Sequence, residues 1–317
     1  VVVSEMAKNK TGKKKIVVAS ILAALAMQTA GVTDVAAAAG DLPSASYANG
    51  TVASGKTNGL AIGNAANSGS NQSIAIGYFS EATAPEVTPA ALPATAVGAG
   101  AKAKGYSTVA LGLSAAAEAD SATALGSKTS ATGDRTVAVG SDANATGRYA
   151  SAFGADASAV GNATAVGANS LASVDAAVAV GTDSKATGNY ASALGGGATA
   201  SNNDATAFGH GTVASGASST ALGTRAKAGA LAAVGVGMFA NATKEYSIAI
   251  GGESSSSADN SIAIGKKSSA TGENGIAIGA STISKGANGV AVGTNGTTAE
   301  LGGVAVGQAA KSNKFNS

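Results

Sequence analysis

Apolar and small residues alternate along most of this chain in a pattern that recurs every 14 residues. Thr136-Val137-Ala138-Val139-Gly140 shows the pattern, with β-branched residues on either side of a small one and a closing Gly. The closing Gly occurs 18 times, at Gly63, Gly77, Gly98, Gly112, Gly126, Gly140, Gly154, Gly167, Gly181, Gly195, Gly209, Gly223, Gly237, Gly251, Gly265, Gly279, Gly293 and Gly307. Two steps differ: 21 residues from Gly77 to Gly98 and 13 from Gly154 to Gly167. So many copies at a fixed spacing indicate a repeat architecture.

Each period predicts two short strands and two turns. Taking the closing Gly as position 0, positions −3 to −1 alternate as a strand does. Half a period later, a second Gly marks another turn in several copies, where we expect a positive φ. These glycines are Gly105, Gly133, Gly147, Gly188, Gly216, Gly272 and Gly286. Fourteen residues leave no room for a helix, so each period predicts one flat coil of a β-solenoid.

The large aliphatic residues are predicted to form the core of each coil. They occupy positions −3 and −1, as in Val137, Val139, Ile248, Ile250, Ile262 and Ile264. Positions +3 and +5 on the second strand carry only small residues, which requires a thin coil. Positions +2, +4 and +6 are mostly polar and are expected to face water.

Position −2 is expected to form a seam between subunits. It holds Ala in 17 copies and Gly235 in the other, and we place these residues on the outside of the coil. The predicted seam consists of Ala110, Ala124, Ala138, Ala152, Ala179, Ala193, Ala221, Ala249, Ala263, Ala277, Ala291 and Ala305. A coil that buries about two aliphatic side chains gains roughly 1.5–3 kcal/mol from each, whereas ordering it costs about 1.5 kcal/mol per residue. The sequence therefore predicts an obligate homo-oligomer, and the alternative is a solvated surface of small residues.

Composition points away from catalysis. The chain has 45 Gly, 3% aromatic residues and no Cys, so it offers little for a globular core and no thiol chemistry. The single His210 is assigned to a solvated turn. Tyr149, Tyr190 and Tyr246 are assigned to turn packing or to an irregular aromatic line along one edge. No acid/base pair, metal set or phosphate loop is recognisable, so we expect no enzyme activity, no cofactor and no metal.

Several segments lie outside the repeats. Residues 1–39 are predicted to be a helical signal peptide, because a lysine-rich start precedes an apolar run of 12 residues; a retained anchor helix is the alternative. Without these residues the chain keeps 15 basic and 16 acidic groups, which gives no indication of nucleic-acid binding. Residues 40–54 are a lead-in, residues 55–307 are the repeats and residues 308–317 a tail. Residues 78–94 contain Pro85, Pro89 and Pro93 and are predicted to leave the stack as a loop.

The repeats resemble the head domain of YadA-like trimeric autotransporter adhesins, which carry Ser-Val-Ala-Ile-Gly motifs. Residues 260–265, Asn-Ser-Ile-Ala-Ile-Gly, and residues 72–77, Gln-Ser-Ile-Ala-Ile-Gly, are similar to that motif. The resemblance implies a left-handed parallel β-roll of about 18 coils in a homotrimer. It also implies a neck, a stalk and an outer-membrane anchor, which this sequence does not display, so the chain looks like a partial member.

The expected function is adhesion. The resemblance implies an exported, non-enzymatic head at the bacterial cell surface, in the outer membrane if attached to an anchor and otherwise secreted. Its partners would be copies of itself and host matrix proteins or neighbouring cells. Eighteen coils at about 4.8 Å each predict a rod on the order of 80 Å. The alternatives are a structural spacer or fibre segment without a ligand of its own, and an ice-binding solenoid, which would need a regular Thr ladder.

Overall fold

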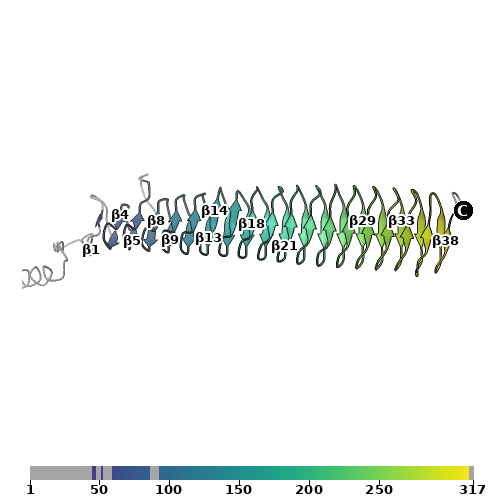
Figure 1. The fold of residues 1–317 in the computed structure, drawn as a ribbon. Helices are drawn as coiled ribbons and strands as arrows, with labels where there is room; N and C mark the ends of the chain where they lie inside the picture. Colours follow the sequence, from purple (N-terminus) through teal and green to yellow (C-terminus); the bar gives the residue numbers. More distant parts are fainter. Residues whose placement is uncertain (1–44, 48–50, 53–58, 86–92, 314–317) are drawn as a thin grey trace, which may run out of the picture.

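The chain forms a rod of stacked coils in which all secondary structure of the described residues is β (Figure 1). The computed structural model describes residues 45–47, 51–52, 59–85 and 93–313. The predicted signal peptide, most of the lead-in, the centre of the insertion and the end of the tail lie outside these residues.

One strand of each coil belongs to a first parallel ladder, built from the odd-numbered strands. These are β1 (Ala45–Tyr47), β3 (Leu60–Ile62), β5 (Ile74–Ile76), β7 (Thr95–Val97), β9 (Val109–Leu111), β11 (Thr123–Leu125), β13 (Val137–Val139), β15 (Ser151–Phe153), β17 (Thr164–Val166), β19 (Val178–Val180), β21 (Ser192–Leu194), β23 (Thr206–Phe208), β25 (Thr220–Leu222), β27 (Val234–Val236), β29 (Ile248–Ile250), β31 (Ile262–Ile264), β33 (Ile276–Ile278), β35 (Val290–Val292) and β37 (Val304–Val306).

The other strand of each coil belongs to a second parallel ladder, built from the even-numbered strands. These are β2 (Thr51–Val52), β4 (Asn67–Ser68), β6 (Glu81–Ala82), β8 (Lys102–Ala103), β10 (Ala116–Ala117), β12 (Ser130–Ala131), β14 (Asn144–Thr146), β16 (Ser158–Val160), β18 (Leu171–Ala172), β20 (Lys185–Ala186), β22 (Thr199–Ala200), β24 (Val213–Ala214), β26 (Lys227–Ala228), β28 (Asn241–Ala242), β30 (Ser255–Ser256), β32 (Ser269–Ala270), β34 (Ile283–Ser284), β36 (Thr298–Ala299) and β38 (Lys311–Ser312).

Register within each ladder follows the sequence period, so equivalent residues stack on one another. Ala138 of β13 pairs with Ala124 of β11 and with Ala152 of β15. The stack also continues across the irregular steps. β5 pairs with β7 across the 21-residue step, and β15 pairs with β17 across the 13-residue step. The predicted parallel β-solenoid of about 18 coils is confirmed; its left-handed sense stays a prediction from the resemblance.

The structure adds one coil that the period does not reveal. β1 and β2 lie in the predicted lead-in and pair with β3 and β4. The register joins Ala45 to Leu60 and Thr51 to Asn67, steps of 15 and 16 residues. A coil longer than the period escapes a search for a 14-residue spacing.

The interior of the coil contains only small side chains. Positions −4, −2, +3 and +5 point inward, as in Thr136, Ala138, Ala143 and Ala145, which are all fully buried. In the coil after Gly293 the second pair is shifted by one residue, to Thr297 and Ala299. These four positions face one another across the two ladders, and the buried alanines from Ala61 to Ala249 form one continuous cluster. Two sheets filled by methyl and hydroxyl groups approach closely, and this explains the flatness of the coil.

Buried hydroxyl groups in this interior bond to the backbone. Thr129 Oγ1 donates to the carbonyl of Gly126 at 2.8 Å, and Thr136 Oγ1 donates to the carbonyl of Gly133 at 2.6 Å. Each bond spans three residues, from a core position back to the first residue of the preceding turn. At these core positions Ser and Thr therefore replace Ala without leaving an unpaired polar group, whereas the buried hydroxyl of Ser70, in a turn, has no hydrogen-bond partner among the described residues.

The turn geometry differs from the sequence prediction. Of the seven glycines expected to have a positive φ, only Gly147 has one, at 80°. The left-handed residue comes two positions later and is usually not Gly, as with Arg135 at 55°. Gly133 is small for another reason, because a Cβ there would collide with the backbone of Gly147 in the next coil. Close stacking of coils, rather than a positive φ, explains this second set of glycines.

The closing Gly of the repeat combines both constraints. Gly140 has a φ of 131°, and a Cβ there would overlap the carbonyl of Gly154 in the next coil. We expect Gly140→Ala to lower the free energy of unfolding by about 2–3 kcal/mol, because strain and the clash act together. Urea unfolding followed by circular dichroism measures the change. Gly252→Ala is the matched control, because the nearest atom to its added Cβ, Met238 O, is 3.9 Å away. Equal unfolding midpoints for the two variants would contradict the explanation.

Candidate adhesive surface

The outer surface of the rod has an aliphatic face, a polar face and two edges formed by turns. The aliphatic face consists of positions −3 and −1 of the odd-numbered strands, whose burial pattern places the middle residue inside and its neighbours outside. Ile250 is 37% exposed and Val306, in the last coil, 68%. Phe153 and Phe208 lie in the same rows and are also exposed. An apolar face that continues over so many coils is unusual for a solvated surface.

The predicted assignment of the two sides of this strand is therefore wrong. The residues predicted as coil core, Val137, Val139, Ile248, Ile250, Ile262 and Ile264, lie on the outside. The residues predicted as a seam are buried within their own coil: Ala110, Ala124, Ala138, Ala152, Ala179, Ala193, Ala221, Ala249, Ala263, Ala277, Ala291 and Ala305. The physical reason is thickness, because two sheets that approach closely enough to pack Ala against Ala leave no room for Ile or Phe.

A signal for the correct assignment is present in the sequence. Small residues occupy both −4 and −2 on one strand and both +3 and +5 on the other, so the two strands present matching small sides. The −3 and −1 rows vary far more in size, from Ser151 to Phe153 within one strand. A shared interior requires the uniform rows to face each other, and the variable rows then face out.

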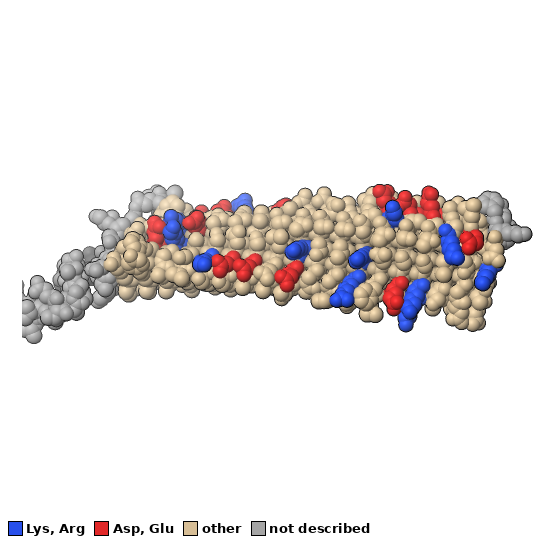
Figure 2. Space-filling view, viewed as in Figure 1, with Lys and Arg blue, Asp and Glu red and all other residues tan. Residues whose placement is uncertain are grey.

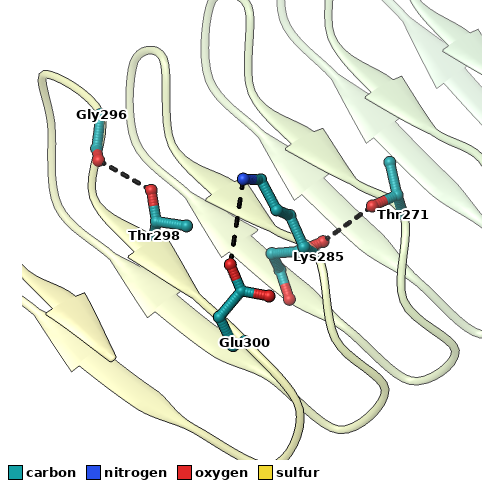
Figure 3. A network of polar contacts seen from close by, with 6 residues as sticks. Thr271, Lys285, Gly296, Thr298 and Glu300 are labelled. Carbon is teal, nitrogen blue, oxygen red and sulfur yellow. Dashed lines mark hydrogen bonds and ion pairs between the residues drawn. The ribbon is translucent and has the colours of Figure 1, made fainter. Parts of the chain in front are cut away.

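The polar face consists of the outward residues of the even-numbered strands. Near the C-terminal end of the described residues, Lys285 Nζ lies 3.9 Å from Glu300 Oε1 in the next coil (Figure 3). On the same face Thr271 Oγ1 donates to the carbonyl of Ser284 at 3.4 Å, and Thr298 Oγ1 donates to the carbonyl of Gly296 at 3.0 Å. Such exposed pairs contribute little to stability. In the view of Figure 2, charged groups are sparse and both signs are mixed along the rod.

Apart from Phe153 and Phe208, the exposed aromatic rings lie on the turn edges. Tyr78 and Phe79 contact each other edge to face, with ring centroids 4.4 Å apart. On the opposite edge, Arg135 and Arg148 both lie over the ring of Tyr149, and Arg135 Nη1 also donates to Tyr149 Oη at 2.6 Å. Of these contacts, the one between Arg135 and Tyr149 joins adjacent coils, and sequence reasoning missed it because it depends on stacking.

The three tyrosines and the histidine that the sequence assigns to turns all lie in turns. Tyr149, Tyr190 and Tyr246 occupy the same turn position and are exposed, but they are several coils apart and form no continuous line. His210 lies exposed in a turn. Among the described residues, no group of three His, Cys, Asp or Glu side chains could hold a metal ion.

One carboxylate on the turn edge is tied to the neighbouring coil. Asp175 Oδ1 accepts hydrogen bonds from Asn162 Nδ2 at 2.6 Å and from the Asn162 backbone N–H at 3.2 Å. These bonds favour the charged form and lower the pKa of Asp175 below its usual value. A carboxyl whose pKa is lowered by folding stabilises the fold above its unfolded pKa and loses that effect as the pH falls through the folded value. Because this carboxyl is exposed to water, its contribution to the stability of the fold is small.

The segments of this chain that match a known family coincide with the repeats. The family model described as the YadA head domain repeat (2 copies) matches residues 53–80, 93–115, 103–129, 117–143, 131–157, 161–184, 175–198, 186–212, 200–226, 214–237, 242–268 and 270–295. These segments cover well over half of the chain. The chain belongs to the YadA head family.

A solved structure of the family is also similar to this chain. The crystal structure of the collagen-binding domain of the Yersinia adhesin YadA is 28% identical, with a TM-score of 0.32. The match covers 48% of this chain and 77% of that chain. No curated protein matches this YadA head chain. Within the described residues, none of the structure is a helix long and apolar enough to cross a membrane.

Proposed function

We propose that this chain is the head of an adhesin exported to the bacterial cell surface, where it attaches the cell to host extracellular matrix or to other cells. The observation that supports the proposal most directly is the match of YadA head repeats along nearly all of the described rod. Adhesion requires a surface that presents the same chemistry many times, and the stack of equivalent coils provides one (Figure 1).

The aliphatic face supports the second part of the proposal, which is assembly into a homotrimer. Its −1 row holds Val, Leu, Ile or Phe in every coil from β3 to β37, its −3 row holds Ser or Thr in seven coils and an aliphatic residue in the others, and neither row carries a charge. Burial of such a face against two other copies in the same register removes apolar area from water in every coil. The polar face and the turn edges would then form the outside of the assembly, where a ligand binds.

If adhesion arises from many weak contacts, the affinity for a matrix protein should depend strongly on assembly of the chains. The full chain is expected to bind immobilised matrix proteins, with collagen tested first because the similar Yersinia domain is described as collagen-binding. At equal chain concentration, an assembled head should bind at least about 100-fold more tightly than a dissociated one. Surface plasmon resonance over a panel of matrix proteins, together with attachment of whole cells, measures this difference.

The binding experiment tests one alternative function, and the residues of the polar face argue against the other. A spacer or fibre segment would bind no matrix protein and no cell in the panel, and that result would overturn the adhesin proposal. An ice-binding solenoid needs a regular Thr ladder. Consecutive coils of the polar face instead present Lys185, Thr199, Val213, Lys227 and Asn241.

A further inference from the structure

Five Asn-X-Ser/Thr triplets lie within the described residues, and the structure divides them into two groups. The asparagines are Asn71, Asn144, Asn162, Asn241 and Asn295. This triplet is the acceptor motif for sugar attachment to an asparagine side chain, where both the amide and the hydroxyl two residues later take part. A triplet is usable only where both groups are free and face the same side.

In three triplets one of the two groups is already occupied. The Ser73 hydroxyl of the first is buried and donates to the carbonyl of Ser70 at 2.6 Å. The Thr297 hydroxyl of the last is also buried and donates to the carbonyl of Thr294 at 3.1 Å. In the third, the Asn162 amide donates to the Asp175 carboxylate at 2.6 Å.

The two remaining triplets lie on the polar face. In each, the Asn is at position +4, the Thr at +6 and a fully buried Ala between them, in Asn144-Ala145-Thr146 and Asn241-Ala242-Thr243. Side chains two residues apart on a strand point to the same side of the sheet. Asn144 and Thr146 both lie in β14, and Thr243 directly follows β28, where its backbone N–H continues the ladder by donating to the Ser256 carbonyl. No hydrogen bond joins either amide or either hydroxyl to another residue in the described part of the chain.

The neighbours of both asparagines leave room for a bulky group. Asn144 is flanked in the ladder by Ser130 and Ser158. Asn241 is flanked by Ser255 and by Lys227, whose long side chain can move aside. Both sites are on the opposite ladder from the aliphatic face, so an attached sugar does not block association of that face.

We propose that Asn144 and Asn241 are glycosylation sites. In the reaction, the side-chain Nδ2 forms a bond to the anomeric carbon of a sugar that is activated as a nucleotide- or lipid-linked diphosphate. The bond from that carbon to the diphosphate oxygen breaks, the diphosphate leaves with the electron pair, and the amide gives up one proton. The product carries a neutral, strongly hydrated group at two levels of the polar face.

The test uses the folded full chain, an asparagine-specific glycosyltransferase and UDP-glucose, with peptide mass spectrometry to measure occupancy at each site. Occupancy at Asn144 and Asn241 is expected to exceed that at Asn71, Asn162 and Asn295 by at least about tenfold, since the latter must first lose a hydrogen bond. Thr146→Val should abolish modification of Asn144 and leave Asn241 unchanged, whereas Thr146→Ser should retain both. These two substitutions change one half-buried side chain on the outer face and leave the interior intact.

A second arm separates selection by the fold from selection by local sequence. The same reaction on the chain unfolded in urea, at a concentration that the enzyme tolerates, should bring all five sites to similar occupancy. Two results would overturn the proposal: absence of sugar from both Asn144 and Asn241 in the folded chain, or the same order of preference in the folded and unfolded chains.

Discussion

Replacing Ile250 and Ile278 with lysine is expected to convert the assembled head into single chains. Both side chains are exposed on the aliphatic face, in coils on either side of Ile264. In an assembly around this face, each substitution places a charge among apolar groups of the neighbouring chains, where it lacks a partner and loses its hydration. Analytical ultracentrifugation should change from three times the 29.5 kDa chain mass to one.

A matched control for this variant adds the same charge on the other side of the rod. Ser255 and Ser269 lie on the polar face, in ladder positions that other coils fill with Lys185 and Lys227. Ser255→Lys with Ser269→Lys should leave the mass of the assembly unchanged. If the Ile250 and Ile278 variant keeps the mass of the unchanged protein, the aliphatic face is not the contact between chains.

Ala249→Leu, one residue before Ile250, is expected to disrupt the folding of the coil itself rather than the association of chains. Ala249 is fully buried and stacks between Gly235 and Ala263 in the ladder. Overpacking of a well-filled core commonly costs about 1–3 kcal/mol, and the flat interior leaves so little room for adjustment that we expect at least about 3 kcal/mol. Urea unfolding followed by circular dichroism measures the loss.

Single Ser255→Lys is the control for Ala249→Leu, because it enlarges an outward residue on the facing strand of the same coil. Its unfolding midpoint should match that of the unchanged protein. Together, the two pairs of variants distinguish the observed arrangement from the reverse one. If alanines faced outward and isoleucines inward, Ala249→Leu would affect association and the isoleucine variant would unfold the chain.

The sequence predicts the coil because the coil is set by spacing. Gly140 and its equivalents give the period, and the alternation around Ala138 gives the strand. The place of each strand in its ladder then follows, because coils of equal length stack with equivalent residues paired. Only a coil of unequal length, such as the one formed by β1 and β2, escapes this reasoning.

The orientation of the coil is harder to predict, because the usual rule that large apolar residues face inward fails here. That rule assumes an interior wide enough to accept them, and alternation along Ile248-Ala249-Ile250 is equally compatible with either orientation. The deciding quantity is the distance between the two sheets, which depends on both strands together. Contacts between turns, such as that of Arg135 with Tyr149, join residues of adjacent coils, so the sequence of one period does not predict them.

The direction of the backbone hydrogen bonds has a mechanical consequence. Those between coils, such as Val137 N–H to the Ala150 carbonyl, run along the length of the rod. A pull on the two ends of one chain therefore loads the coil junctions in series, and the weakest junction opens first. Each 14-residue coil that opens releases at most about 50 Å of extended chain. Under tension such a rod lengthens in steps, and in the proposed adhesin each step would absorb work that otherwise acts on the bond between the cell and its target.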